Sequence, residues 1–319
     1  MIWLDALRVF ACFSVAAVHI SLTFNIPGRI GQFMAAGSNG LGIFYILSGF
    51  LAYYSMERYK GNAGGWIGKK LLRILPMYYF ALVVFVVFYE FILRSVPEDP
   101  NKIKWLSYFL GINTILKKGP VFWYNIGALS SMSIFLWFYC LVPLMRRIIN
   151  NFNRSLIFLL AAYGMLRALQ YTEYLTMFRA YYYFAIGITV YYAITEHKEK
   201  ITMLLFAFVI MLLMLADSKG GLGYGLTVGI FIMSCVDLTI KNDFISKIIV
   251  FFSKRSFAIY IAHTAVMQIA GEYVENYNFK SFIIMFIATV AATAVLYEGI
   301  EVGFVKGYRT IMHRCVSVR

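Results

Sequence analysis

Charged residues are scarce in this chain, and acidic ones are the scarcest. Asp and Glu together number 15 in 319 residues, and charged residues of both signs make up 14% of the chain, against about 25% in soluble domains. Hydrophobic residues make up 61%, and the mean hydropathy is +0.73. This composition excludes a soluble domain and predicts a protein that crosses a membrane several times.

Cysteine is also rare, and its spacing excludes the common metal motifs. The four cysteines are Cys12, Cys140, Cys235 and Cys315. They lie far apart and form neither a CxxC pair nor a Cys/His ligand spacing. We therefore expect them to be packing residues for the most part, and we expect no metal cofactor.

Basic residues outnumber acidic ones and give a net charge of +14. Such a charge is compatible with nucleic-acid binding. Lys and Arg also accumulate in the cytoplasmic loops of membrane proteins, however, and this explanation fits the composition better. We therefore expect membrane lipids, and no nucleic acid, among the partners.

Ten apolar stretches predict an all-α transmembrane bundle that forms a single domain over residues 1–319. The stretches are roughly 5–24, 33–56, 74–93, 126–146, 155–171, 179–195, 201–217, 220–239, 256–272 and 281–301. With the N-terminus inside, 18 of the 29 Lys and Arg residues fall in cytoplasmic loops or the tail. Both termini are then expected in the cytoplasm. The first stretch has no small-residue cleavage site nearby, so we expect it to be a retained span.

The first predicted span carries a polar stripe. Arg8 and His19 are separated by eleven helical steps of 100°, which end about 20° past three full turns and about 16 Å along the axis. Asp5 and Cys12 fall on the same side. Ionisable groups inside a membrane are costly and are candidates for function by default. The alternative is a structural stripe with a satisfied, buried imidazole.

Two further features have both a functional and a structural explanation. Lys69, Lys70 and Arg73 stand directly before the predicted third span, where they are suited to hold phosphates or to anchor the helix at the cytoplasmic surface. Residues 37–50 read GSNGLGIFYILSGF, and their glycines allow either close helix packing or close approach of backbone to a ligand. Packing is the simpler explanation for the glycines.

Six short motifs follow one another along the chain. They are Asp5–Arg8 with His19, Phe44–Phe50, Lys70–Pro76, Phe138–Pro143, Ser256–His263 and Tyr297–Phe304. In this order they resemble the motifs D-G-x-R followed by His, F-x-x-S-G-F, R-x-x-R-x-x-P, F-Y-x-x-x-P, S-x-x-I-Y-x-x-H and Y-x-x-I-E-x-P-F of the acyltransferase-3 family of bacterial membrane acyltransferases. Together they extend over nearly the whole chain.

The chain departs from the family pattern at several positions. Ala6 replaces Gly, Lys70 replaces Arg, Gly303 replaces Pro, and the second motif is one residue longer. Many members also carry a Trp and a Glu ahead of the Phe-Tyr pair, and those places correspond here to Ser130 and Phe135. Trp123 and Asn125 are the candidates for taking over that role and binding the acceptor.

The resemblance implies an enzyme that transfers a short acyl group, usually acetyl, from cytoplasmic acyl-coenzyme A to a hydroxyl of a surface glycan. The expected location is the bacterial inner membrane. The resemblance does not determine whether the protein forms a homo-oligomer, which acyl group it transfers, or on which face of the membrane the glycan is modified. The chief alternative is a transporter or flippase for a polysaccharide or lipid-linked sugar, although the chain lacks the paired halves common in transporters.

The resemblance also suggests roles for single residues. His19 is the expected general base, or else a nucleophile that is itself acylated. Arg8 contributes to the donor cavity with Asp5 orienting it. Lys70 and Arg73, with Lys69, hold the phosphates of coenzyme A. Two assignments are more open: Ser48, with backbone near Gly49, is the oxyanion candidate, and His263 either binds the donor or packs.

Overall fold

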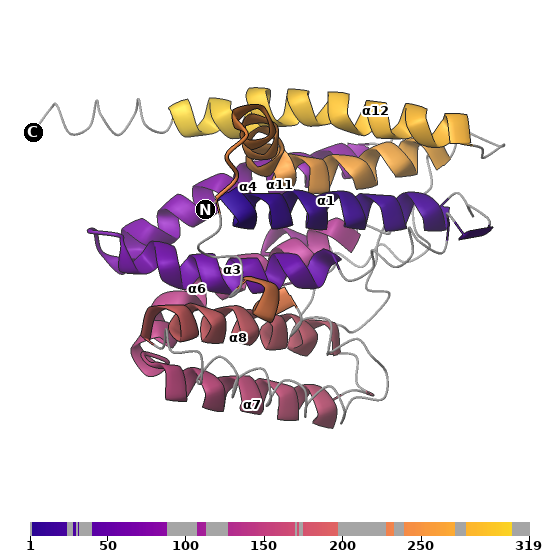
Figure 1. Ribbon diagram of the computed structural model, residues 1–319. Coiled ribbons are helices and arrows are strands. Elements are labelled where there is room, and N and C mark those ends of the chain that lie inside the picture. The colour runs from indigo at the N-terminus through magenta and orange to yellow at the C-terminus, as the bar shows by residue number, and fades with distance from the viewer. Residues whose placement is uncertain are drawn as a thin grey trace, which may run out of the picture. The chain divides into compact units, whose positions relative to one another are not determined.

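The structure of the protein is a computed structural model that describes residues 2–23, 28–29, 31, 40–87, 107–112, 127–169, 171, 175–196, 228–232, 239–271 and 279–307. Regular structure within these ranges is helical, and the ranges contain no strand (Figure 1). The elements are α1 (Ile2–Thr23), α3 (Gly40–Glu57), α4 (Ala63–Val87), α6 (Gly127–Ile148), α7 (Phe152–Ala168), α8 (Leu175–Glu196), α11 (Asp243–Gly271), α12 (Phe279–Val295) and the π-helix η3 (Leu296–Glu301).

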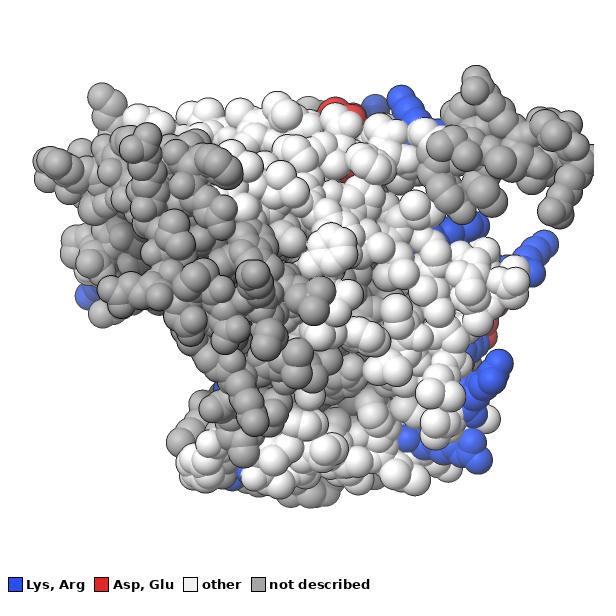
Figure 2. Space-filling model, turned by 180° about the vertical axis from the view of Figure 1, so that it is seen from behind, with Lys and Arg blue, Asp and Glu red and all other residues white. Residues whose placement is uncertain are grey.

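Four helical stretches in the described part of the chain are long and apolar enough to cross a membrane. They are Ile2–Ser21, Ala63–Val87, Leu129–Ile148 and Ile283–Gly307. Figure 2 shows one face of the molecule, on which uncharged side chains cover most of the described surface. The protein is therefore all-helical where it is described and has membrane-embedded character, as the sequence predicts. The count of ten spans and the cytoplasmic termini stay predictions.

Most predicted spans correspond to helices, but two helices begin earlier than expected. α4 begins at Ala63 rather than near residue 74, and α11 begins at Asp243 rather than near residue 256. In each case an Asn side chain caps the extension: Asn62 Oδ1 accepts from Gly65 N at 2.8 Å, and Asn242 Oδ1 accepts from Phe244 N at 3.0 Å. Hydropathy alone misses these first turns, because they precede the long apolar runs. The predicted spans 201–217 and 220–239 lie largely outside the described residues.

The chain divides into two compact units, which we describe separately. The first unit comprises Met1–Val18, Phe33–Lys60 and Cys140–Lys254, and the second comprises His19–Gln32, Gly61–Tyr139 and Arg255–Arg319. The boundaries fall inside three helices, α1, α6 and α11, so each of these helices contributes to both units. The predicted single domain over residues 1–319 stays a prediction.

Close helix packing organises the first unit, in which α8 lies beside both α3 and α7 (Figure 1). Two glycines, Gly49 of α3 and Gly187 of α8, bring the backbones of these helices together. A Cβ at Gly187 would lie 2.0 Å from Ile46 O, and one at Gly49 would lie 2.4 Å from Phe184 O. Only glycine permits this approach, so the glycines of α3 that the sequence singled out serve packing, as the simpler explanation held.

In the second unit, α12 continues without a break into η3, and the helical chain runs on to residue 307. A π-helix is rare and often marks a functional position, because the extra residue per turn changes the direction of the side chains that follow. Here the π-helical segment contains Tyr297, Glu298 and Glu301, three of the residues of the last family motif. α4 packs against this segment.

Candidate functional site

Helix α1 carries the polar stripe that the sequence predicts. Asp5, Arg8, Cys12 and His19 follow one another at intervals of three, four and seven residues, which place them on one face. Cys12 is 1% exposed, whereas Phe10, on the opposite face, is 58% exposed. The polar face is therefore covered by protein at its centre, and an apolar side chain points outward, as expected for a helix in a membrane.

Asp5 and Arg8 form an ion pair within the first unit, and Ser253 is hydrogen-bonded to both residues. Arg8 Nη1 lies 3.5 Å from Asp5 Oδ1. The hydroxyl of Ser253, on α11, donates to Asp5 Oδ1 at 2.5 Å and accepts from Arg8 Nη1 at 3.2 Å. Asp5 and Arg8 are therefore paired in the structure, and the role of Arg8 in the donor cavity stays a prediction.

Ser253 is a member of this cluster that the sequence analysis missed. It lies three residues before the Ser256–His263 motif and faces α1 from the buried side of α11, with 2% of its surface exposed. No local pattern marks it, because its partners lie about 250 residues away and come together only in the fold. In the sequence, only its place one helical turn before Ser256, on the same side of the helix, could have indicated it.

The second unit brings His19 and His263 together. The centroids of the two imidazole rings are 5.3 Å apart, and their planes are inclined by 53°. His19 is exposed, whereas His263 is 1% exposed. Because α11 begins at Asp243 and not near residue 256, His263 lies beyond the midpoint of its helix.

Buried polar side chains continue from His263. Its ring lies 5.5 Å from that of Tyr260, one turn earlier on α11. The hydroxyl groups of Tyr260 and Ser131 are 2.6 Å apart and form a buried hydrogen bond between α11 and α6. Histidine, tyrosine and serine thus form a connected row behind His19, and Ser131 is a second member that the sequence did not reveal.

An apolar cluster holds the end of α1 at this place. Ile20, Met267 and Met285 pack together, and each is at most 4% exposed. Ile20 adjoins His19 in the chain, and Met267 lies one turn beyond His263 on α11. The contact between the two histidines is therefore fixed by the packing of their immediate neighbours.

The three predicted phosphate-binding cations lie inside α4 and not in a loop before it. The earlier start of the helix at Ala63 explains this difference. Lys70 Nζ lies 5.1 Å from the ring centroid of Trp66 and 5.6 Å from that of Tyr139. Lys69 is exposed. Arg73 also has an exposed side chain, but its Nε donates to Glu301 Oε1 at 3.2 Å.

The π-helix η3 supplies carboxylates to two arginines. Glu301 binds Arg73, and Glu298 forms a close ion pair with Arg255 of α11. The guanidinium carbon of Arg255 also lies 4.7 Å from the ring centroid of Tyr297. The last family motif therefore supplies Glu301 to Arg73, and it supplies Glu298 and Tyr297 to Arg255.

Ser48 and Gly49, the oxyanion candidates, lie in the interior of α3. Gly49 faces the backbone of Phe184, and backbone N–H groups within a helix are already bonded to carbonyl oxygens four residues earlier. The suggestion that backbone near Gly49 stabilises an oxyanion is therefore wrong. The hydroxyl of Ser48 is partly buried, and its role stays a prediction.

The two acceptor-binding candidates, Trp123 and Asn125, lie outside the described residues. Ser130 and Phe135, which stand where many relatives have Trp and Glu, are both 7% exposed within α6. These two positions therefore belong to the packed part of α6.

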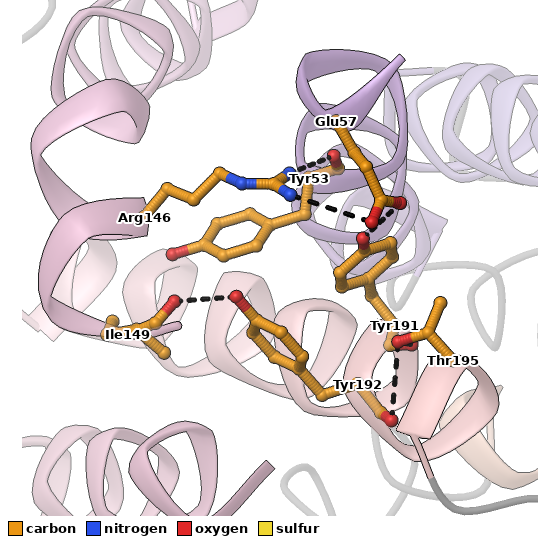
Figure 3. Close-up of polar contacts among 7 residues, drawn as sticks. All are labelled: Tyr53, Glu57, Arg146, Ile149, Tyr191, Tyr192 and Thr195. Carbon is orange, nitrogen blue, oxygen red and sulfur yellow. Dashed lines mark hydrogen bonds and ion pairs between the residues drawn. The ribbon is translucent and has the colours of Figure 1, made fainter. Parts of the chain in front are cut away.

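A separate polar cluster joins the C-terminal ends of α3, α6 and α8 in the first unit (Figure 3). Arg146 Nη1 donates to the backbone oxygen of Tyr53 at 2.7 Å, and Arg146 Nη2 lies 3.8 Å from Glu57 Oε1. The hydroxyl of Tyr191 donates to the other oxygen of Glu57, and that of Tyr192 donates to Ile149 O. This cluster satisfies carbonyl groups that a helix end leaves open and fastens three helices to one another.

Comparison with known proteins identifies the chain by its family. No group of three or more His, Cys, Asp or Glu side chains in the described ranges is arranged to hold a metal ion. No curated protein and no solved structure matches the chain significantly. The family model of an acyltransferase domain matches residues 1–298, which include the first five sequence motifs and the first two residues of the last one. The chain therefore belongs to the acyltransferase-3 family and is a membrane acyltransferase.

Proposed function

We propose that this protein transfers an acetyl or other short acyl group from cytoplasmic acyl-coenzyme A to a hydroxyl of a cell-envelope glycan in the bacterial inner membrane. One observation carries the proposal: His19 shares the polar face of a membrane-length helix with Asp5 and Arg8, and its ring contacts that of the buried His263. Ionisable groups that face the protein inside a membrane segment are candidates for function.

His19 acts as the general base in this proposal. The imidazole takes the proton from the acceptor hydroxyl while that oxygen attacks the thioester carbon. The carbon–sulfur bond then breaks, and coenzyme A leaves as a thiol after taking the proton back from His19. Histidine suits both steps because its ordinary pKa, about 6.5, allows it to gain and lose a proton near neutral pH.

The alternative route makes His19 the nucleophile. The imidazole nitrogen then attacks the thioester, coenzyme A leaves, and the acyl-imidazole passes the group to the hydroxyl. Rapid mixing with radiolabelled acetyl-coenzyme A, in the absence of acceptor, distinguishes the two routes. A label on the protein that the His19→Ala variant lacks supports the nucleophile, and its absence from the wild-type protein supports the base.

The donor phosphates are assigned to the exposed beginning of α4. Lys69, Lys70 and Arg73 fall within one turn and a half, and a planar guanidinium binds phosphate oxygens in pairs. Lys70 lies near two aromatic rings and Arg73 is held by Glu301, so both cations have a defined position before the donor arrives. Preorganisation of this kind lowers the entropy lost on binding.

Arg8, with Asp5 and Ser253, is assigned to the donor path on the basis of its place on α1. It shares a face with His19 about 16 Å further along the helix. The ion pair with Asp5 allows this charge to lie in an apolar helix at a lower cost. In the same proposal the chain is one domain with ten spans and both termini in the cytoplasm, so that α1 runs from the cytoplasm outward.

The deciding experiment uses the full chain in lipid nanodiscs with acetyl-coenzyme A. The proposal predicts release of free coenzyme A that depends on an added envelope glycan, together with a mass increase of one acetyl group on that glycan. The His19→Ala variant should insert normally and lose this activity. Retained transfer in that variant would reject the assignment of His19. Glycan movement across the membrane without acylation would instead favour the transporter.

A further inference from the structure

The two nitrogens of the His263 ring have different surroundings. Nδ1 lies 3.2 Å from the backbone oxygen of Ile259, one turn earlier on α11. A carbonyl oxygen only accepts hydrogen bonds, so Nδ1 carries the proton in this contact, and Nε2 of the neutral ring is an acceptor. Nε2 is buried and has no hydrogen-bond partner in the described part of the chain. A buried acceptor without a donor is costly and requires an explanation.

The nearest ring that can supply a donor is that of His19. A hydrogen bond of about 3 Å between two ring nitrogens, added to the radii of the two rings, gives a centroid separation close to the 5.3 Å observed. The two planes are inclined by 53°. The separation of the two rings is therefore that of a histidine pair joined through one N–H group, and the contact requires only a turn of the exposed His19 ring about its side-chain bonds.

We propose that His263 is a positioning residue for His19: its Nε2 accepts the N–H of one His19 nitrogen and leaves the other nitrogen unprotonated and available to the acceptor hydroxyl. The proposal rests on the assignment of His19 under the proposed function and adds to it. It replaces the two roles that the sequence allowed for His263, donor binding and packing.

The contact also stabilises charge during the reaction. When His19 takes a proton from the hydroxyl, both of its nitrogens carry hydrogen and the ring becomes positive. The lone pair of His263 Nε2 then faces a charged donor, and such a hydrogen bond is roughly twice as strong as a neutral one. The acceptor is in place before the charge develops, which is the condition for electrostatic stabilisation of a transition state.

The surroundings of His263 keep its acceptor in a fixed place. Tyr260, in contact with the His263 ring, is itself bonded to Ser131 of α6. Ile20, next to His19 in the chain, and Met267, one turn beyond His263, pack together in one apolar cluster. A ring that is 1% exposed and held on these sides has little freedom to turn, so the direction of Nε2 is set by the fold.

The test compares two substitutions at one position. His263→Phe keeps a ring but removes the acceptor, whereas His263→Gln offers a side-chain oxygen near the place of Nε2. For His263→Phe we expect kcat to fall on the order of tenfold to a hundredfold, within the range for a general base, with the KM for acetyl-coenzyme A unchanged. His263→Gln should recover most of kcat. The pH at which kcat rises, which reports the deprotonation of His19, should also shift in His263→Phe and should stay unchanged in His263→Gln.

A spectroscopic measurement separates this inference from the proposed function. Nitrogen-15 NMR of ring-labelled histidine in nanodiscs reports the tautomer of His19, with the His19→Ala variant identifying its signals. One dominant tautomer in the wild-type protein and a mixture in His263→Phe would support the proposal, even if no acyl transfer were found. An unchanged tautomer together with an unchanged kcat would overturn it, and so would a raised donor KM with kcat intact.

Thermal unfolding of both variants controls for a structural effect. His263→Phe and His263→Gln should unfold at temperatures close to one another, because each replaces a buried side chain of similar size. If kcat fell in proportion to the unfolding temperature in both variants, and His263→Gln did not recover kcat, His263 would be a packing residue and the proposal would fail.

Discussion

Arg73 of α4 and Glu301 of η3 form an ion pair across 228 positions of sequence, with Arg73 Nε 3.2 Å from Glu301 Oε1. The side chain of Glu301 is 9% exposed and that of Arg73 is 47% exposed. The second carboxylate oxygen, Oε2, is buried and has no partner among the described residues. Arg73 therefore has two roles: it pairs with the buried carboxylate of Glu301, and in our proposal it also binds a phosphate of the donor.

A double-mutant cycle separates these functions. Arg73→Ala should weaken the binding of acetyl-coenzyme A by about tenfold to a hundredfold, the loss of about 1.5–3 kcal/mol for hydrogen bonds to a charged group. It should also lower the free energy of unfolding by about 1–2 kcal/mol, because Glu301 is left unpaired. This is less than for a fully buried pair, since about half of Arg73 is exposed.

Adding Glu301→Gln to Arg73→Ala should restore stability but not donor affinity. Glu301→Gln alone should leave the donor Kd nearly unchanged, because the amide oxygen still accepts from Arg73 Nε. Isothermal titration and thermal unfolding in nanodiscs measure the two quantities. An unchanged donor Kd in Arg73→Ala would remove Arg73 from the proposed phosphate site.

Removing the hydroxyl that joins Asp5 and Arg8 should have a small effect. Ser253→Ala deletes one hydrogen bond to each partner but leaves the ion pair at 3.5 Å. We expect a loss of about 1–2 kcal/mol of stability and a decrease in acyl transfer of about tenfold or less. Ser253→Thr, which keeps the hydroxyl, is the matched control. A loss of activity as large as that of Arg8→Ala would assign Ser253 a greater role than orientation.

The contact between α3 and α8 should tolerate no added methyl group. Gly187→Ala places a Cβ where Ile46 O now lies, and the two backbones must separate. Overpacking of this kind costs about 1–3 kcal/mol or more. Gly164→Ala, on α7, is the control: nothing lies within 4 Å of its added Cβ, and alanine favours a helix over glycine. The unfolding temperature should fall for Gly187→Ala and not for Gly164→Ala. Equal unfolding temperatures of the two variants would contradict the close approach of the α3 and α8 backbones.

The cluster at the ends of α3, α6 and α8 predicts a difference between two adjacent arginines. Arg146→Ala removes the hydrogen bond to Tyr53 O and the ion pair with Glu57. The free energy of unfolding should therefore fall by about 1–3 kcal/mol. Arg147 is exposed, and Arg147→Ala should change stability by no more than about 0.5 kcal/mol. Chemical denaturation of the two variants measures the difference, and equal losses would show that the cluster contributes nothing specific.

The sequence predicted the class of the protein and much of the helix content. Low charge and long apolar runs indicate membrane helices, because each such segment must satisfy its own backbone groups. The starts of α4 and α11 were missed, since the first turns that Asn62 and Asn242 cap precede the long apolar runs. Pro76 was expected near the beginning of a span, but it lies well inside α4.

The sequence by itself determined what a single helix or an ordered set of motifs can carry: the family, the membrane character, and the common face of Asp5, Arg8 and His19. Helical periodicity and hydropathy are local, so they are readable along the chain. Only the tertiary structure decided the partners, namely Ser253 for the Asp5–Arg8 pair, Glu301 for Arg73, and His263 for His19. These contacts join residues more than 200 positions apart, and they depend on which helix faces pack together.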